Sequence, residues 1–251
     1  MKTACFIPIK GSSKRVYKKN TRSLSDRPLF TYVLDEVLEC DVFDDIFVDT
    51  DSDTVKKYCE NKNIKIIDRD PELIKDSANG NDLLVHWAKI KPDYDLYFQV
   101  FVTSPFLSTQ TLEQTVSVLK THTEYDSVFT AVEEHTWFWY DDKAVNYDPK
   151  VLPRSQDARP LIKETTSLYG ITRESLLEGR SRIGNAPYIY LVDSVEAIDI
   201  DNQFDFFVAE QIQNGLKSSS PLLENYRRGR KIEDKSFKKN GYEERPEDLP
   251  Y

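Results

Sequence analysis

The sequence contains few cysteines and no long hydrophobic run, and each shortage excludes a class of protein. The three cysteines, Cys5, Cys40 and Cys59, are odd in number and lack C-x-x-C spacing, which indicates neither a disulfide framework nor a zinc site. The apolar runs are too short for a transmembrane helix. Residues 4–9 are too few for the core of a signal peptide, and a basic loop follows them instead of a small-residue cleavage site. We therefore expect a cytoplasmic protein without a membrane partner.

Histidine and surplus positive charge are also scarce. His86, His122 and His135 are scattered and form no Ser-His-Asp or Cys-His pattern, so each is more typical of a structural residue than of a catalytic one. The net charge is −9, whereas a general nucleic-acid-binding protein carries a dominant basic surface. We therefore expect no nucleic-acid partner. A length of 251 residues with 39% hydrophobic side chains fits a globular chain of one large domain or two small ones.

Short apolar runs alternate with segments of helical period through the first half of the chain. The predicted strands are residues 3–9, 46–48, 64–67, 95–102 and 127–132, and the predicted helices are residues 28–39, 52–62, 80–91 and 109–121. Strands separated by helices predict βαβ units with right-handed crossovers. The fold class is therefore α/β with a mostly parallel sheet. In such sheets, ligands bind at the carboxyl ends of the strands.

The alternation stops between residues 133 and 164, which are aromatic, charged and interrupted by prolines. A long irregular segment inside a compact domain is typical of a functional arm or lid, and a surface β-insertion is an equal alternative. Strands return at residues 167–172 and 188–192, and a helix follows Asn202. Residues 217–251 alternate blocks of both charges, which is typical of a loosely held tail. We predict one domain, residues 1–216 with the inserted arm 133–164, and then a polar C-terminal tail, residues 217–251.

Six cations and no acid lie in the stretch KGSSKRVYKKNTR, directly after the first predicted strand. In Lys10-Gly11-Ser12-Ser13-Lys14, small residues let backbone N–H groups approach an anion while the lysines balance its charge. The second glycine and the GK[ST] ending of a Walker A loop are absent. The position after a strand favours a phosphate-binding loop, and a solvated strand-to-helix turn is the alternative.

The stretch EAIDID, residues 196–201, offers two carboxylates with one residue between them. In a strand, residues two apart point to the same face, so Asp199 and Asp201 would be paired while Ile198 and Ile200 pack behind them. Paired carboxylates suit Mg²⁺, which prefers oxygen ligands and phosphate partners. A magnesium site and an exposed strand end with two solvated acids are equal alternatives here.

Three other stretches are candidates for ligand contact. In VDTDS, Asp51 or Ser52 is placed to cap the next helix, and a ligand or metal contact by Asp49 or Asp51 is the alternative. Thr103-Ser104-Pro105 places hydroxyl groups for a base or ribose, or simply begins the next helix. The aromatic residues 137–140 suit a sugar site or an oligomer interface, although a locally packed cluster is the commoner arrangement.

Taken in order, these motifs resemble the acylneuraminate cytidylyltransferase family, the CMP–sialic acid synthetases and their relatives. The matching stretches cover residues 4–212 and are IPIKGSSKRVYKKN, FVDTDS, DLLVHWA, VTSPF, RSQDARPLIKETTSLYGI, EAIDID and DFFVAE. The resemblance implies a Rossmann-like nucleotidyltransferase fold with a β-rich insertion that reaches across a homodimer. It also implies CTP and a small acidic sugar as substrates. The anomeric hydroxyl of a 2-keto sugar acid, a sialic-acid-like nonulosonate, would attack the α-phosphate of CTP and release pyrophosphate.

The resemblance implies roles for individual residues. Lys14, Asp199 and Asp201 would be catalytic, and the two aspartates would hold Mg²⁺. The nucleotide-binding residues would be Lys10, Gly11, Ser12, Ser13, Lys14, Lys19, Asn20, Asp51 and Ser104. The residues near the sugar would be Gln156, Glu164, Thr165 and Tyr169. Cations and metal would offset the charge that builds on the phosphates. Because no strong protein base is evident, the working hypothesis is metal-assisted ionisation of the substrate hydroxyl.

The chain departs from the family pattern in four places. Lys10 stands where arginine is usual, which replaces a bidentate donor by a point charge. The glutamine of LLQPTSP, which is expected near the base, is displaced in FQVFVTSP. Two alternatives are open: Gln99 takes its place, or no residue does. Glu164-Thr165-Thr166 stands for E-N-G or E-T-G, and the arginine after TSPL is missing. Two of these changes lie toward the acceptor. Octulosonate, a phosphonate or another small acid is therefore an alternative acceptor, and a catalytically silent nucleotide-binding scaffold is an alternative protein.

Overall fold

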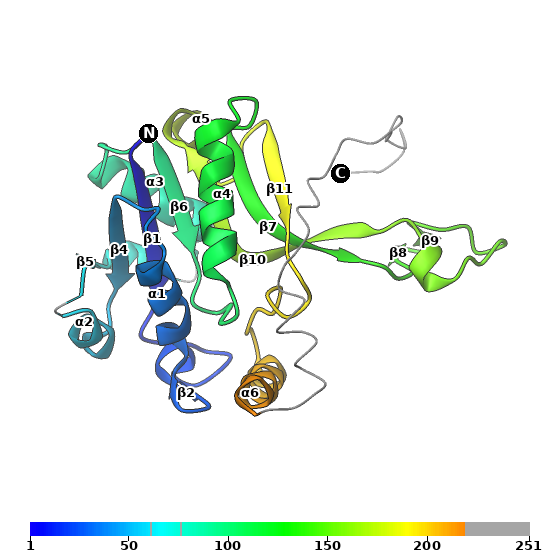
Figure 1. Ribbon diagram of the computed structural model, residues 1–251, viewed down its shortest axis with the longest axis horizontal. Coiled ribbons are helices and arrows are strands. Elements are labelled where there is room, and N and C mark those ends of the chain that lie inside the picture. Colours follow the sequence, from blue (N-terminus) through cyan, green and yellow to red (C-terminus); the bar gives the residue numbers. More distant parts are fainter. Residues whose placement is uncertain (61, 76, 219–251) are drawn as a thin grey trace.

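The computed structural model of the protein describes residues 1–60, 62–75 and 77–218. Its centre is a seven-stranded sheet with the strand order β11-β7-β10-β6-β1-β4-β5 (Figure 1). The strands are β1 (Thr3–Ile9), β4 (Asp45–Thr50), β5 (Lys65–Asp68), β6 (Leu96–Val100), β7 (Ser127–Glu134), β10 (Leu161–Thr172) and β11 (Pro187–Leu191). β10 runs antiparallel to both of its neighbours, and the other pairings in this sheet are parallel. The prediction of a mostly parallel α/β sheet is therefore confirmed.

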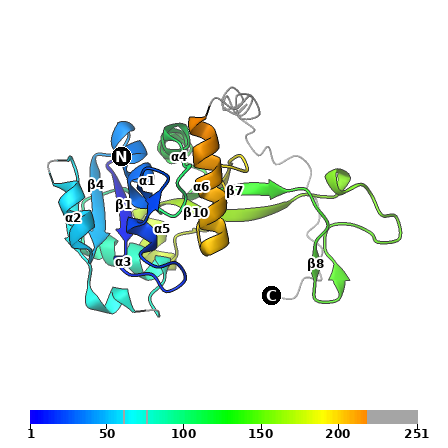
Figure 2. The same cartoon turned by 90° about the horizontal axis from the view of Figure 1, so that it is seen from below.

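Helices cover both faces of the sheet because alternate residues of a strand point to opposite sides. From β1, Cys5, Ile7 and Ile9 pack with α1, α2 and α4 on one face. Ala4 and Phe6 pack with α3 and α5 on the other face (Figure 2). These helices are α1 (Leu29–Glu39), α2 (Asp53–Cys59), α3 (Gly80–Ile90), α4 (Thr109–Thr121) and α5 (Arg173–Gly179). Each strand and helix predicted before residue 132 is present.

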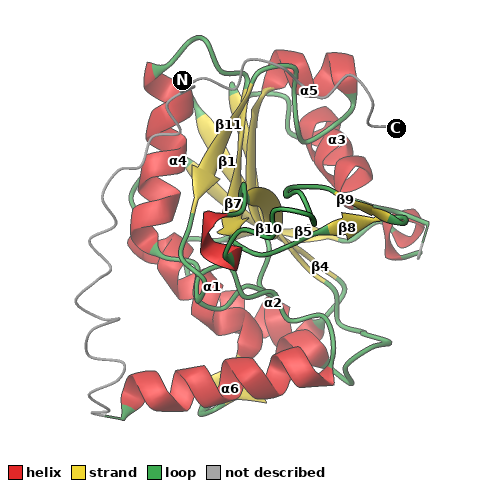
Figure 3. Ribbon diagram, turned by 90° about the vertical axis from the view of Figure 1, so that its right-hand side faces the viewer, coloured by secondary structure: helices red, strands yellow, loops and turns green. Residues whose placement is uncertain are grey.

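The last helix in the described residues, α6 (Gln203–Lys217), lies beyond the ends toward which the parallel strands run (Figures 1 and 3). The helix starts with a capping box. The Asn202 side chain accepts the backbone N–H of Asp205, and the Asp205 carboxylate accepts the backbone N–H of Asn202. Phe206 and Ala209 of α6 share a buried cluster with Val16 of the basic loop. The C-terminal helix therefore packs on the N-terminal basic loop.

Residues 133–164, which comprise the end of β7, the start of β10 and the chain between them, project from the body of the protein and are called the arm (Figure 1). At its root the two strands continue as an antiparallel pair. Farther out are the hairpin β8 (Trp139–Tyr140) and β9 (Lys143–Ala144) and a 3-10 helix, Ser155–Asp157. Trp139 donates from Nε1 to the Tyr147 hydroxyl at 2.9 Å, so part of the aromatic cluster packs locally. Exposed apolar side chains also occur there, among them Trp139, Tyr140, Val151 and Leu152.

Two local predictions are wrong. EAIDID is not a strand, because the Asp193 carboxylate accepts the N–H groups of Val195 and Glu196 and turns the chain after β11. Alternate residues, Ile198 and Ile200, still pack against the core, which is why the sequence resembles a strand. In VDTDS, Ser52 begins α2 without a capping hydrogen bond from its side chain. The Asp51 carboxylate is instead bonded to the basic loop.

The remaining elements are short. β2 (Ser23–Leu24) and β3 (Arg27–Pro28) form a hairpin before α1, and 3-10 helices occur at Lys19–Thr21 and Pro71–Ile74. No helix in the described part of the chain is long and apolar enough to cross a bilayer. The predicted tail, apart from its first two residues, lies outside the described residues.

Candidate active site

Segments that are distant in the sequence meet at the carboxyl edge of the sheet. The basic loop, residues 10–22, follows β1, and Thr103 follows the adjacent strand β6. Ile200, from the loop before α6, connects them: its N–H donates to the Thr103 carbonyl at 2.9 Å, and its own carbonyl accepts from Lys19 Nζ at 2.6 Å. This is the edge at which open α/β sheets bind their ligands.

The basic loop takes its shape from two polar side chains. The Gly11 N–H donates to Asp51 Oδ1, at the end of β4, at 2.6 Å. A Cβ at Gly11 would lie 3.1 Å from Ser52 Cβ, which is tighter than an ordinary contact. Asn20 donates from Nδ2 to the Lys10 carbonyl at 2.8 Å and closes the loop. Asp51 and Asn20, both predicted as nucleotide ligands, therefore also fix the loop's backbone.

Two cations of the basic loop contact Asp201. Arg15 Nη2 lies 2.8 Å from Asp201 Oδ1, and Lys19 Nζ lies 3.7 Å from the same oxygen. Burial lowers the pKa of Lys19, and the charge of Asp201 opposes this shift. The side chains of Arg15 and Asp201 are 65% and 47% exposed, so an incoming ion can reach this pair. The basic loop and Asp201 thus form one charged site, although about 180 residues separate them in the sequence.

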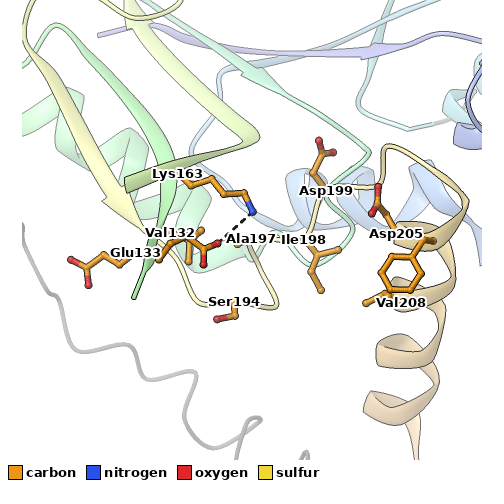
Figure 4. Close-up of a pocket in the computed structure, with 11 residues that line it drawn as sticks. Val132, Glu133, Lys163, Ser194, Ala197, Ile198, Asp199, Asp205 and Val208 are labelled. Carbon is orange, nitrogen blue, oxygen red and sulfur yellow. Dashed lines mark hydrogen bonds and ion pairs between the residues drawn. The ribbon is translucent and has the colours of Figure 1, made fainter. Parts of the chain in front are cut away.

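Asp199 lies in different surroundings from Asp201. Its Oδ2 accepts from Thr166 Oγ1 of β10 at 2.7 Å, while its Oδ1 is buried without a hydrogen-bond partner. Figure 4 shows Asp199 beside Ile198 and Asp205 on the wall of a pocket of about 340 Å³. Leaving a buried carboxylate oxygen unpaired is costly. Asp199 Oδ1 is therefore placed to meet a cation or a donor from a ligand.

The available donors fit a Mg²⁺ ion that arrives with a polyphosphate. In the described residues, no group of three or more His, Cys, Asp or Glu side chains could hold a metal ion. Asp199 and Asp201 supply two carboxylates, and Mg²⁺ commonly binds one or two carboxylates together with phosphate oxygens and waters. The unpaired Oδ1 of Asp199 agrees with that arrangement. The protein part of such a site is thus incomplete without its ligand.

A second polar group lies on the neighbouring part of β10. The Tyr169 hydroxyl donates to Glu164 Oε2 at 2.7 Å, and burial, followed by this bond, raises the pKa of the phenol. Arg182 Cζ lies 3.6 Å from the centre of the Tyr169 ring. No carboxylate of the described chain forms an ion pair with Arg182. A guanidinium stacked on a ring keeps its edge N–H groups for a bidentate anion.

Sequence reasoning missed Arg182 and Arg15 as site residues. Arg182 lies in the irregular loop between α5 and β11, outside every motif. Its only sequence signal is a cation shortly before a sheet strand, which is too common to single out a residue. Arg15 lies inside the basic loop, but its contact with Asp201 depends on the way the chain closes.

Several predicted site residues have other contacts in the single chain. The Thr165 hydroxyl is buried and bonded to Thr130 Oγ1 at 2.8 Å and Ser167 Oγ at 2.7 Å. Gln156 is exposed on the 3-10 helix of the arm, which projects away from the body (Figure 1). Within one chain, Glu164 and Tyr169 therefore join the site, whereas Gln156 does not.

The predicted nucleotide ligands of the basic loop also differ in exposure and in their contacts. Ser12 and Lys14 are exposed, and Ser13 Oγ accepts the Val16 N–H at 3.5 Å. Lys10 donates from Nζ to the Ile74 carbonyl at 2.7 Å.

Asp49, the other aspartate of VDTDS, is enclosed by the fold. Its carboxylate accepts from Arg69 Nε and from Trp87 Nε1, and its side chain is 1% exposed. This arrangement identifies Asp49 as a structural residue.

Buried polar atoms without partners gather at this edge. Among the described residues, the buried side-chain atoms lacking a hydrogen bond are Asn20 Oδ1, Gln99 Oε1, Ser104 Oγ, Asp199 Oδ1 and Arg173 Nε. The first four belong to the basic loop, the end of β6, the loop after it and the loop before α6. Folded proteins pair nearly all such atoms. Their concentration at one edge therefore makes this edge the candidate site for a polar ligand.

Comparisons with known proteins show the family of the chain. Residues 4–204 match the family model described as "Cytidylyltransferase". The N-acylneuraminate cytidylyltransferase of Oncorhynchus mykiss is 30% identical over 216 residues, which cover 83% of this chain and 49% of that protein. The enzyme of the same name from Streptococcus agalactiae is 28% identical, covering 82% of this chain and 52% of that protein. The chain thus spans about half the length of these curated relatives.

A relative of similar length and two solved structures complete the comparison. The CMP-N,N'-diacetyllegionaminic acid synthase of Legionella pneumophila is 25% identical and is covered over 96% of its length by 84% of this chain. A CMP:2-keto-3-deoxy-manno-octonic acid synthetase complexed with CTP superimposes with a TM-score of 0.62 at 14% identity, covering 86% of this chain and 100% of that one. The 4-diphosphocytidyl-2C-methyl-D-erythritol synthase of Anaerococcus prevotii gives 0.63 at 15% identity, covering 85% and 96%.

These two structures establish the nucleotidyltransferase fold and no more, because their sequence identity is low. The family model, in contrast, matches most of the chain. The resemblance suggested by the ordered motifs is therefore confirmed. On this evidence the chain belongs to the cytidylyltransferase family.

Proposed function

We propose that the protein is an enzyme that transfers CMP from CTP to a 2-keto sugar acid of the sialic-acid type, with release of pyrophosphate. The observation that carries the proposal is the group of unpaired buried polar atoms beside the charged site of Arg15, Lys19 and Asp201. Cations suit a triphosphate, and the two aspartates suit its metal ion. Relatives named for acylneuraminates support the acceptor class.

The basic loop would bind the triphosphate of CTP. The backbone N–H groups of Ser12 and Ser13 and the ammonium groups of Lys10, Lys14 and Lys19 are suitable partners for phosphate oxygens. Beside the loop, Asn20 Oδ1 is an unpaired acceptor and Ser104 Oγ is an unpaired hydroxyl. The amino group of cytosine and the hydroxyls of ribose are matching partners for them. Asp51 would act by holding Gly11 in place.

The reaction requires one bond to form and one to break at the α-phosphorus of CTP. The anomeric hydroxyl oxygen of the acceptor would form the new P–O bond, and the bond to the oxygen bridging the α- and β-phosphates would break. The hydroxyl proton would pass to water. Lys14 and Lys19 would offset the charge that grows on the phosphate oxygens. Mg²⁺ held by Asp199 and Asp201 would supply Lewis acidity that lowers the pKa of the hydroxyl and neutralises pyrophosphate.

The acceptor would lie along β10, next to Asp199. There the unpaired guanidinium of Arg182 suits a carboxylate, and Gln99 Oε1 suits a hydroxyl group. The bonded pair of Glu164 and Tyr169 adds polar groups to the same wall. Thr165 would support this wall from within, because its hydroxyl is bonded inside the fold.

A homodimer would complete the acceptor end. The arm carries exposed apolar side chains, among them Trp139, Tyr140 and Val151, and such surfaces commonly mark a protein interface. An arm that reaches across the dimer would bring Gln156 to the partner's acceptor. The cytoplasm, which supplies CTP, is the proposed location.

The test is pyrophosphate release with CTP and Mg²⁺ across a panel of acceptors. The panel contains N-acetylneuraminate, legionaminic and pseudaminic acids, octulosonate and simple phosphonates. Release with one nonulosonate, and with no other nucleoside triphosphate in place of CTP, is the expected result. Pyrophosphate release only with octulosonate or a phosphonate would show that this compound, and not a nonulosonate, is the acceptor. If no acceptor gave pyrophosphate release and calorimetry detected no CTP binding, the proposed enzymatic function would be wrong and a scaffold protein would be favoured.

A further inference from the structure

β10 is interrupted where it passes Asp199. Its pairing with β7 is regular up to Glu164 and resumes at Tyr169, with a shift of register between them. Within this interruption Thr166 has a φ of 55°, in the left-handed region. A β-branched side chain is rare there because it crowds its own backbone, whereas glycine adopts the conformation easily. Thr166 therefore holds a backbone conformation that threonine disfavours.

The contacts of the side chain show what this conformation achieves. Thr166 Oγ1 lies 2.7 Å from Asp199 Oδ2 and also 2.7 Å from the Thr165 carbonyl oxygen. The Thr165 side chain is itself bonded to Thr130 and Ser167 in the interior, so the backbone beside Thr166 is anchored. Strained residues persist where the surrounding structure fixes them, and they concentrate at functional sites.

The two oxygens of Asp199 consequently differ. Oδ2 is occupied by the Thr166 hydroxyl, and Oδ1 is buried without a partner. The hydrogen bond fixes the rotation of the carboxylate, so the side chain cannot turn its free oxygen elsewhere without losing that bond. A carboxylate held in this way is prepared to bind a cation through one oxygen.

We infer that Thr166 is a positioning residue, which orients Asp199 so that Oδ1 faces the Mg²⁺ that accompanies CTP. The inference rests on the proposed function, because it takes CTP and Mg²⁺ as the ligands. Partners that orient a metal ligand commonly set the affinity of the site for its metal. The hydroxyl group is the essential feature, and the methyl group of threonine is not.

Three substitutions separate the hydroxyl from the backbone conformation. Thr166→Ser keeps the hydroxyl, Thr166→Val keeps the branched shape without it, and Thr166→Gly removes the hydroxyl while relieving the backbone. CTP binding is measured by calorimetry with Mg²⁺ and again with EDTA, and thermal unfolding is followed without ligands. We expect the Mg²⁺-dependent gain in CTP affinity to fall about tenfold in the valine and glycine variants and to be retained by serine. With EDTA, the four proteins should bind CTP alike.

Several outcomes would overturn the assignment. An unchanged Mg²⁺-dependent gain in the valine and glycine variants would do so, and so would a loss in the serine variant as large as in valine. If the valine variant unfolds, the glycine variant still decides, because glycine tolerates a φ of 55°. In an Asp199→Asn background, Thr166→Val should have no further effect, and an additive loss would contradict the inference. Failure of the unsubstituted protein to bind CTP with Mg²⁺ would instead overturn the proposed function.

Discussion

The end of the site proposed for the nucleotide and the end proposed for the acceptor are built differently. The proposed nucleotide end consists mainly of the basic loop, residues 10–22, which directly follows β1 and in which Asn20 donates to the Lys10 carbonyl. The proposed acceptor end combines Gln99, Tyr169 and Arg182, which come from β6, β10 and the loop after α5. The shape of the basic loop depends on local chain geometry, whereas the grouping of Gln99, Tyr169 and Arg182 depends on the register of the sheet. We therefore expect single substitutions at the proposed acceptor end to alter acceptor affinity while leaving the basic loop, and with it CTP affinity, unchanged.

Asp199 stands between the two ends, so removing it should have the largest effect. We expect Asp199→Ala to lower turnover by about 100- to 1,000-fold, the range seen when a group that stabilises transition-state charge is removed. The measurement is the rate of pyrophosphate release at saturating Mg²⁺, with the unfolding temperature as the control for folding. Full activity would show that the metal assignment is wrong.

The acceptor end is tested separately by Arg182. A lost hydrogen bond to a charged group corresponds to about a 10- to 100-fold change in affinity, so Arg182→Met should raise KM for the acceptor by that factor. The affinity for CTP should not change. Arg180→Gln, an exposed arginine of the same loop, is the matched control for the loss of charge. Equal effects on acceptor and CTP would remove the distinction between the two ends.

Gln156 tests whether the arm of a partner completes the acceptor end. An exposed neutral hydrogen bond contributes little, so Gln156→Ala should raise KM for the acceptor about fivefold. The effect should disappear when Trp139→Arg separates the subunits, as followed by analytical ultracentrifugation. No change in either background would exclude Gln156 from the acceptor site.

The smallest expected effect concerns protons at the nucleotide end. Burial lowers the pKa of Lys19, so at alkaline pH part of the free protein carries a neutral amine. A bound triphosphate favours the ammonium form, and CTP binding should therefore take up protons. Calorimetry in two buffers of different ionisation enthalpy, at about pH 9, measures this uptake. Lys19→Arg should abolish it, because arginine stays charged. Equal uptake in both proteins would mean that another group titrates.

The sequence allowed the central sheet to be predicted because burial there follows simple periods. The alternation of β1 and the helical spacing of α1 and α4 are visible without any structure. EAIDID was assigned to a strand because Ile198 and Ile200 alternate with the acids, although within the described residues this stretch forms no strand. Alternating burial indicates a strand only where the chain also meets a sheet edge.

The candidate site could be predicted only where its residues are close together in the chain. The basic loop was visible as a cluster of cations, and Asp199 and Asp201 as a pair. The contact of Arg15 with Asp201, and that of Arg182 with Tyr169, depend on how distant segments are brought together. Thr166 carries no signal of its own, because its left-handed φ becomes visible only in the folded backbone.

The antiparallel strand β10 has a consequence for how assembly and chemistry are connected. It begins at Leu161 in the arm, passes Thr166 beside Asp199, and ends at Thr172 inside the central sheet. One strand thus spans the arm proposed for a second subunit and the residue proposed to orient Asp199, although its pairing with β7 shifts register between Glu164 and Tyr169. The fold therefore connects the arm, proposed as a subunit contact, with Asp199, proposed as a metal ligand, through one strand.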